Sequence, residues 1–290
     1  MDGIIIINKP KGCTSHDIVH KAKKIFNEKV GHTGTLDPMA TGVLPLLIGK
    51  GTLCSKYLIE HDKIYKAKIQ LGVKTDTADQ EGNIIEKSQV DDSIFNIEKI
   101  KNTLKNMIGK NLQTPPIYSA IKVKGKKLYE YARKGENVEI PKREITIYDI
   151  ELTNIDEKNK TIEFKVHCSK GTYIRSLCED IATNLGTIGY MSSLQRVKVV
   201  RFSIENSITI DDLEKNIKND SYIKNHFISI EKLFENEPNI ELNNRKLELF
   251  LNGVKLTHDL KDGVYKIYSN NKFIGLGTVK NNLLKRDVII

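Results

Sequence analysis

The chain has 290 residues, carries 46 Lys and Arg against 37 Asp and Glu, and has a formal net charge of +9. Apolar content of 39% without a long block of charge excludes extended disorder, and the length favours one large domain followed by a small one. The positive charge suits a polyanionic partner and equally suits a basic protein that binds nothing anionic.

The N-terminal segment predicts a short strand and no targeting signal. The apolar run 4–7 lacks a basic flank and is too short for a signal peptide or a membrane span, so we expect a cytoplasmic protein without membrane contact. The four cysteines, Cys13, Cys54, Cys168 and Cys178, show no C-x-x-C pair and no matching histidine spacing. We therefore expect reduced, mostly buried thiols, no metal site and no disulfide.

Apolar periodicity predicts helices and strands in alternation over the first part of the chain. Thr14 or Ser15 is suited to cap a helix that runs to about residue 26. Further along we expect strands over 43–48 and 65–71, a short helix over 53–58 and an amphipathic helix over 97–108.

A glycine-rich loop between residues 31 and 42 reads Gly-His-Thr-Gly-Thr-Leu-Asp-Pro-Met-Ala-Thr-Gly. Its three glycines permit close backbone approach or positive φ, and Pro38 restricts both itself and Asp37. The residues alone leave two interpretations open, an ordinary surface turn and a stiff loop that aims the Asp37 carboxylate.

The segment 110–135 is strongly basic, with seven cations against one acid, Glu130. Tyr118, Tyr129 and Tyr131 lie among the cations, a pattern typical of nucleic-acid binding as well as of a solvated loop. The cations that we take as the binding set are Lys122, Lys124, Lys126, Lys127 and Arg133.

The second half continues with strands and one well-defined helix. We expect strands over 145–152, 162–168 and 194–199, a helix over 174–185, and partly helical structure over 208–237. Pro238 then introduces a compact tail with a short helix over 246–251 and a hairpin of 264–269 with 272–277 across Asn270-Asn271. The predicted boundary divides the chain into domains 1–236 and 237–290.

Three motifs together resemble the TruB-type RNA pseudouridine synthases. They are the loop 31–42, the run Lys-Gly-Thr-Tyr-Ile-Arg at 170–175, and Lys-Pro-Lys-Gly-Cys-Thr-Ser at 9–15. The resemblance implies an α/β (α+β) catalytic domain on a mixed, largely antiparallel sheet flanked by helices, and a small C-terminal PUA-like β-barrel. It also implies that the motif at 9–15 supports the catalytic loop and that 110–135 clamps RNA.

The same resemblance assigns residues to a site. Asp37 is expected to be catalytic, Arg175 to pair with it, and Tyr65 to stack on the target base; without the resemblance, Arg175 suits a helix surface and Tyr65 a core. Further substrate-binding positions are expected at His32, Tyr173, Leu194 and Asp79, the last equally typical of an acidic turn.

The implied activity is isomerisation of uridine-55 in the T-loop of tRNA to pseudouridine, by cleavage of the N-glycosidic bond and reattachment through C5 after base flipping. We expect the T-arm stem-loop of tRNA as substrate, no cofactor and no obligate protein partner. Residue order leaves open whether Asp37 attacks C1′, adds to the ring or abstracts a proton at C2′. Two alternatives are a guide-RNA-dependent synthase subunit and a tRNA-folding chaperone whose main function is binding.

Overall fold

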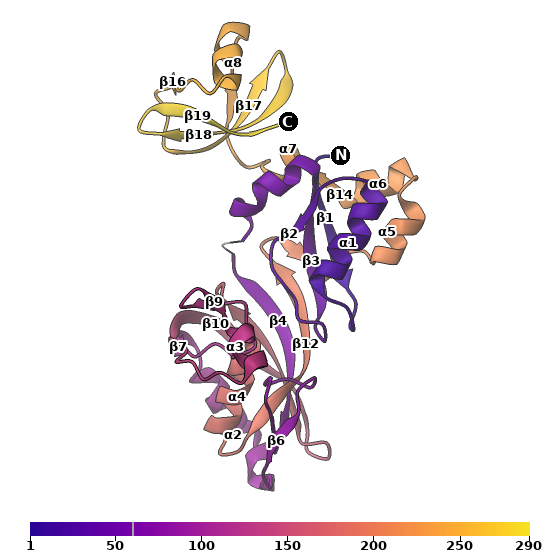
Figure 1. Cartoon of the computed structure of the whole chain (residues 1–290), viewed down its shortest axis with the longest axis vertical. Coiled ribbons are helices and arrows are strands. Elements are labelled where there is room, and N and C mark those ends of the chain that lie inside the picture. The colour runs from indigo at the N-terminus through magenta and orange to yellow at the C-terminus, as the bar shows by residue number, and fades with distance from the viewer. Residues whose placement is uncertain (60) are drawn as a thin grey trace.

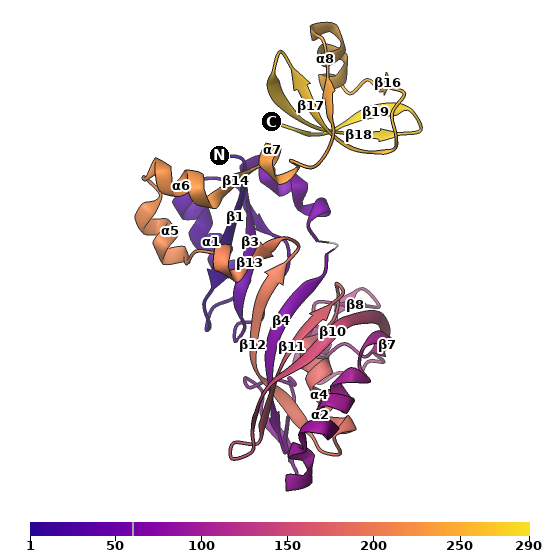
Figure 2. The ribbon, with the colours of Figure 1, turned by 180° about the vertical axis from the view of Figure 1, so that it is seen from behind.

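The structure is a computed structural model that describes residues 1–59 and 61–290. The described residues form a large sheet of ten strands with helices around it and a separate five-stranded sheet near the C-terminus (Figure 1). Seen from behind, the small sheet again lies at one end of the elongated molecule (Figure 2). The expected fold class, a mixed and largely antiparallel sheet with helices plus a small β-rich unit, is confirmed.

Neighbouring strands of the large sheet run antiparallel except where β3 meets β12. In order across the sheet the strands are β14 (Phe227–Ser229), β1 (Gly3–Lys9), β3 (Thr41–Ile48), β12 (Gly189–Val199), β4 (Lys63–Leu71), β11 (Thr161–Cys168), β10 (Arg143–Asp156) and β7 (Gly109–Gln113). Two short strands join this path, β2 (Val30–His32) beside β3 and β13 (Phe202–Ser203) beside β12.

The parallel contact between β3 and β12 is short and divides the sheet into two halves. Its register pairs Gln195 with Thr41 and Arg196 with Gly42. Glycine is required at position 42, because φ is +105° and a Cβ would lie 2.2 Å from the carbonyl oxygen of Arg196. The loop that precedes β3 therefore enters the sheet at the junction between the halves.

Helix α1 (Ser15–Phe26) begins at Thr14 with a capping box. The Thr14 hydroxyl accepts a hydrogen bond from the backbone N–H of Asp17, whose carboxylate accepts from the N–H of Thr14. The other helical segments described around the large sheet are η1 (Gly49–Tyr57), η2 (Asp92–Phe95), α2 (Ile97–Lys105), α4 (Ile174–Asn184), η3 (Ile204–Asn206), α5 (Ile210–Asn216), α6 (Asp220–His226) and α7 (Ile230–Leu233).

Two excursions leave the large sheet. One is the hairpin of β5 (Val73–Thr75) and β6 (Ile84–Lys87). The other follows β7 and contains β8 (Lys122–Val123), β9 (Lys126–Lys127) and α3 (Leu128–Lys134); we call residues 114–142 the insertion. Figure 1 shows the insertion beside β10 in the same half as α2 and α4.

The C-terminal sheet has its own core, which includes Phe250, Ile267 and Leu284. Its strands are β15 (Asn239–Glu241), β17 (Gly263–Ser269), β18 (Lys272–Lys280), β19 (Leu283–Ile289) and β16 (Leu256–Thr257), and α8 (Asn244–Leu251) packs beside it. Asn270 and Asn271 both have positive φ between β17 and β18, so the predicted hairpin is confirmed as a two-residue turn.

A mixed apolar and polar contact joins the small sheet to η1 of the large unit. Cys54 is buried with Leu276 and Val288 in one cluster, and burial raises its pKa to about 12. The carboxylate of Asp287 on β19 accepts hydrogen bonds from Lys56 and Tyr57. The two units are thus in direct packing contact.

Several predicted elements differ in type or length from those observed. Residues 53–57 belong to η1, a 3-10 segment whose C-cap is Leu58, and not to the predicted α-helix. Near its start, Gly51 packs so closely on β1 that a Cβ would lie 2.2 Å from the oxygen of Gly3. The predicted helix over 97–108 ends at Lys105, followed by a chain reversal in which Gly109 has φ of +106°. Strand β7 was not predicted. All four cysteines are free; Cys54, Cys168 and Cys178 are buried and Cys13 is half-buried, which confirms the expectation that most are buried.

Across the described chain we find no helix with the length and apolar character to cross a membrane.

Candidate active site

The loop 33–40 between β2 and β3 is held on both sides of Asp37. The Ser15 hydroxyl accepts from the N–H of Leu36 (2.8 Å) and donates to its carbonyl (3.1 Å). One residue beyond Asp37, the carbonyl of Pro38 accepts from the N–H of Gly12 (2.9 Å). The predicted support of this loop by residues 9–15 is confirmed, and it fixes the backbone that carries the carboxylate.

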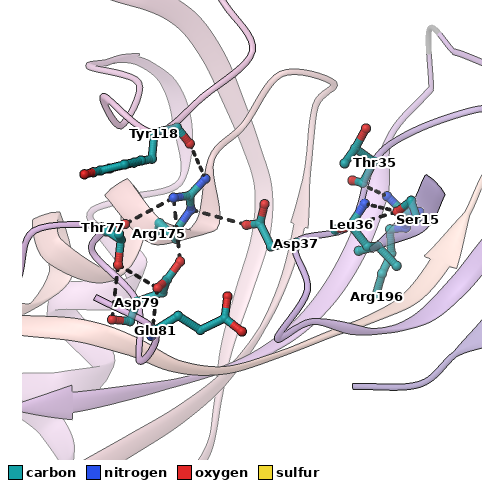
Figure 3. A network of polar contacts seen from close by, with 10 residues as sticks. All are labelled: Ser15, Thr35, Leu36, Asp37, Thr77, Asp79, Glu81, Tyr118, Arg175 and Arg196. Carbon is teal, nitrogen blue, oxygen red and sulfur yellow. Dashed lines mark hydrogen bonds and ion pairs between the residues drawn. The ribbon is translucent and has the colours of Figure 1, made fainter. Parts of the chain in front are cut away.

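Two fully buried cations complete that support. Lys9 donates to three backbone carbonyls, one of them that of Pro38 (3.3 Å). Burial lowers the pKa of the Lys9 ammonium, and nearby acidic groups partly oppose that shift. Arg196 on β12 donates to the carbonyls of Val43 (2.8 Å) and Gly34 (3.0 Å). Figure 3 shows Arg196 and Ser15 on the opposite side of the loop from the Asp37 carboxylate.

Arg175 lies in the first turn of α4 and reaches Asp37 across the junction of the two half-sheets. Its Nε is 3.3 Å from Oδ2 of Asp37, and its side chain is 7% exposed against 36% for Asp37. Its Nη1 donates to the carbonyl of Thr77 (3.1 Å) and its Nη2 to that of Tyr118 (2.9 Å). A planar guanidinium with several donors is therefore fixed against one partly exposed carboxylate (Figure 3).

Asp79 is the second carboxylate on Arg175, with Oδ2 3.6 Å from Nη1. Its other oxygen accepts from the Thr77 hydroxyl (2.7 Å) and from the N–H of Glu81 (3.0 Å), which locks the buried carboxylate in a turn. Burial, together with the charges of Asp79 and Asp37, raises the pKa of Glu81. Two carboxylates, those of Asp37 and Asp79, thus share a single guanidinium.

A cavity of about 750 Å³ opens above this network, within the usual range for small-molecule sites. Five of the expected site residues line it together: Asp37, Tyr65, Tyr173, Arg175 and Leu194. Cationic side chains also line it, namely those of Lys63, Arg143 and Lys170. The cavity accordingly offers an acid, aromatic and aliphatic walls, and positive charge to one ligand.

Tyr65 on β4 is buried, and burial raises the pKa of its hydroxyl while the adjacent Arg196 guanidinium opposes that shift. Its phenol is therefore protonated at neutral pH. His32 on β2 does not line the cavity; its Nδ1 accepts from the N–H of Gly34 (3.2 Å), and burial lowers the pKa of its imidazole.

The expected clamp cations lie on the insertion, outside the cavity lining. Lys122, Lys124, Lys126 and Arg133 are exposed and Lys127 is half-buried. Tyr129 lines the cavity with Lys127 and Arg133 within 5.4 and 5.3 Å of its ring centroid.

Tyr131 differs from the other tyrosines of the insertion, because it is buried and donates to the carbonyl of Val123 (3.0 Å). Its ring therefore belongs to the core of the insertion instead of to the surface that could meet a ligand.

The predicted support from residues 9–15 includes Lys9, whose ammonium contacts the loop. Sequence reasoning missed the role of Arg196 in holding the loop and that of Asp79 as a partner of Arg175. A buried cation in a sheet carries no periodic signal that separates it from a surface cation, so spacing could not have found Arg196. Among the described residues, no group of three or more His, Cys, Asp or Glu side chains is arranged to hold a metal ion.

The fold and this cavity define an enzyme of the pseudouridine synthase class. The family described as "TruB family pseudouridylate synthase (N terminal domain)" matches residues 23–174 of this chain. The family described as "tRNA pseudouridylate synthase B C-terminal domain" matches residues 175–235. A crystal structure of a Cbf5-Nop10-Gar1 complex contains a chain that is 26% identical, with a TM-score of 0.71 over 99% of this chain and 84% of that one.

Curated relatives agree over nearly the whole length. The tRNA pseudouridine synthase B of Clostridium kluyveri is 43% identical over 97% of this chain and 96% of its own, and that of Aquifex aeolicus is 38% identical over 98% of both. The chain belongs to the TruB family of pseudouridylate synthases, and it is an isomerase.

Proposed function

We propose that this enzyme converts uridine-55 in the T-loop of tRNA to pseudouridine. The names of the curated relatives support tRNA as the substrate class. The observation that carries the proposal is the Asp37 carboxylate, partly exposed to a nucleotide-sized cavity and 3.3 Å from the buried guanidinium of Arg175. The reaction breaks N1–C1′, forms C5–C1′ and moves one proton from C5 to N1, so it needs no redox cofactor.

The residues around Asp37 are suited to hold a uracil that has left its stack. Base extrusion costs a few kcal/mol, and stacking on an aromatic ring returns roughly 1–3 kcal/mol per base. Tyr65 supplies a ring fixed in the sheet, and Tyr173 and Leu194 complete the walls of the pocket. We assign His32 to RNA outside the pocket, and Asp79 to holding the Arg175 guanidinium.

The insertion and the C-terminal sheet are proposed to bind RNA outside the cavity. The exposed cations Lys122, Lys124, Lys126 and Arg133 of the insertion, together with half-buried Lys127, would neutralise phosphates of the T-arm beside the cavity. We further propose that residues 1–236 form the catalytic domain and 237–290 a PUA-like RNA-binding domain.

The test is to incubate the wild type and Asp37→Asn with an unmodified tRNA transcript and map any isomerised uridine. We expect product at position 55 with the wild type only, and equal tRNA binding by both. Asp149→Asn, which changes an exposed carboxylate on β10, is the matched control and should retain turnover. Turnover by Asp37→Asn would remove this aspartate from its role.

The same assay separates the alternative functions. The Cbf5 chain that resembles this one was solved with Nop10 and Gar1, so the alternative of a synthase subunit that acts with other proteins is tested as well. Product formed on free tRNA without other proteins would exclude it. Binding without product in the wild type would favour the chaperone.

A further inference from the structure

The side chain of Gln113 forms a clip on the backbone of Tyr173. Gln113 is the last residue of β7 and is 3% exposed. Its Oε1 accepts from the N–H of Tyr173 (2.8 Å) and its Nε2 donates to the Tyr173 carbonyl (3.0 Å). One amide therefore satisfies both backbone groups of a residue that lines the active-site cavity.

Tyr173 is also the N-cap of α4, and its side chain makes no capping hydrogen bond. The N-terminus of α4 is thus fixed by a side chain from another element. Arg175 belongs to the first turn of that helix. The clip therefore fixes the backbone from which the Arg175 side chain reaches Asp37.

Further hydrogen bonds tie the same two stretches of chain together. The Ser176 hydroxyl donates to the carbonyl of Thr114 (2.8 Å), and Arg175 donates to that of Tyr118 (2.9 Å). Pro115 and Pro116 stiffen the stretch between these contacts. The segment 113–118 comprises the last residue of β7 and the first residues of the insertion, so these hydrogen bonds connect the start of the insertion to the N-terminus of α4.

We propose that Gln113 is a positioning residue that couples the insertion to Tyr173 and Arg175, so that RNA contact by the insertion aligns the guanidinium with Asp37. This inference rests on the proposed function. It predicts that loss of the clip slows the chemical step more than it weakens RNA binding, because Gln113 is not one of the clamp cations and does not itself line the cavity.

The experiment compares Gln113→Met and Gln113→Glu with the wild type under single-turnover conditions on a tRNA transcript. Gln113→Met should lower the rate roughly 10- to 100-fold, the scale of a misplacement of about 1 Å, with a tRNA Kd within about threefold of wild type. Hydrogen exchange of the Tyr173 amide should also accelerate.

Gln113→Glu adds a second measurement, the pH dependence of the rate, which would not change if Gln113 only stabilised the fold. A protonated carboxyl reproduces the donor and acceptor of the amide, whereas the ionised form has no donor and faces the Tyr173 carbonyl. Burial raises the pKa of the introduced acid, and Arg143, its neighbour on β10, and Arg175 oppose that shift. The rate relative to wild type should be highest near about pH 5 and fall toward about pH 8.

Gln70→Glu is the matched control, because the Gln70 amide also donates to backbone carbonyls but lies on β4 away from the insertion. Its relative rate should not change with pH. A wild-type rate for Gln113→Met, or a loss in Gln113→Glu that is equal at every pH, overturns the coupling alone. An inactive wild type overturns the proposed function and the coupling with it.

Discussion

Replacing Arg175 with lysine tests whether the shape of the guanidinium matters beyond its charge. The guanidinium donates to two backbone carbonyls and contacts two carboxylates, Asp37 at 3.3 Å and Asp79 at 3.6 Å. A single ammonium cannot serve all four groups, and each lost hydrogen bond of a charged donor is worth about 1.5–3 kcal/mol. Loss of one or two such contacts predicts a rate about 10²- to 10³-fold lower, or roughly 3–4 kcal/mol.

The assay is single-turnover pseudouridine formation at saturating enzyme, with tRNA affinity measured separately. Arg201→Lys is the matched control, since Arg201 also contacts one carboxylate, that of Glu235 (3.1 Å), and two carbonyls, but lies outside the cavity. We expect normal rates for the control. A rate for Arg175→Lys within about threefold of wild type, about 0.7 kcal/mol, would refute the reasoning from donor geometry.

Three further perturbations address the clamp, the contact between units and the helix α4. Glutamine at Lys124, Lys126 and Lys127 together should weaken tRNA binding and lower the slope of log K against log salt by about 2–3; an unchanged slope would show a solvated loop. Asp287→Ala, which removes the acceptor for two side chains of η1, should lower the free energy of unfolding in urea by about 1–3 kcal/mol; an unchanged midpoint would contradict this. Burial raises the pKa of Glu179 above 4.5, so wild-type stability falls as pH rises through that raised value, and Glu179→Gln lacks this loss. Its thermal midpoint should match wild type in acid and exceed it near neutrality, and equal midpoints throughout would contradict the assignment.

The spacing of apolar residues correctly predicted those helices and strands that bury one apolar face. The stripe over 174–185 became α4, and the alternation over 65–71 became β4 from its third residue to its end. Strand β7 gave no such signal, because it lies at the sheet edge where Leu112 is exposed and Gln113 is buried, the reverse of the expected polarity. Gln113 is buried because its side-chain amide bonds the backbone of Tyr173.

Site residues that belong to a recognisable motif could be predicted from the sequence. Site contacts that are made by backbone groups could not. The loop around Asp37 and the run ending at Arg175 stand out as motifs, and they meet in the structure as expected. The carbonyls of Thr77 and Tyr118 leave no trace in a sequence, since every residue has a carbonyl. Long-range pairing of this kind requires the fold.

The charge balance around Arg175 explains how Asp37 can be both held and available. Buried Asp79 is locked by its own hydrogen bonds and shares the guanidinium, so Arg175 faces two carboxylates with one positive charge. Nε lies 3.3 Å from Oδ2 of Asp37, whose side chain is 36% exposed and lines the cavity. Asp37 is therefore oriented by the guanidinium while its carboxylate stays open to the cavity, an arrangement that suits the proposed role of a nucleophile or general base.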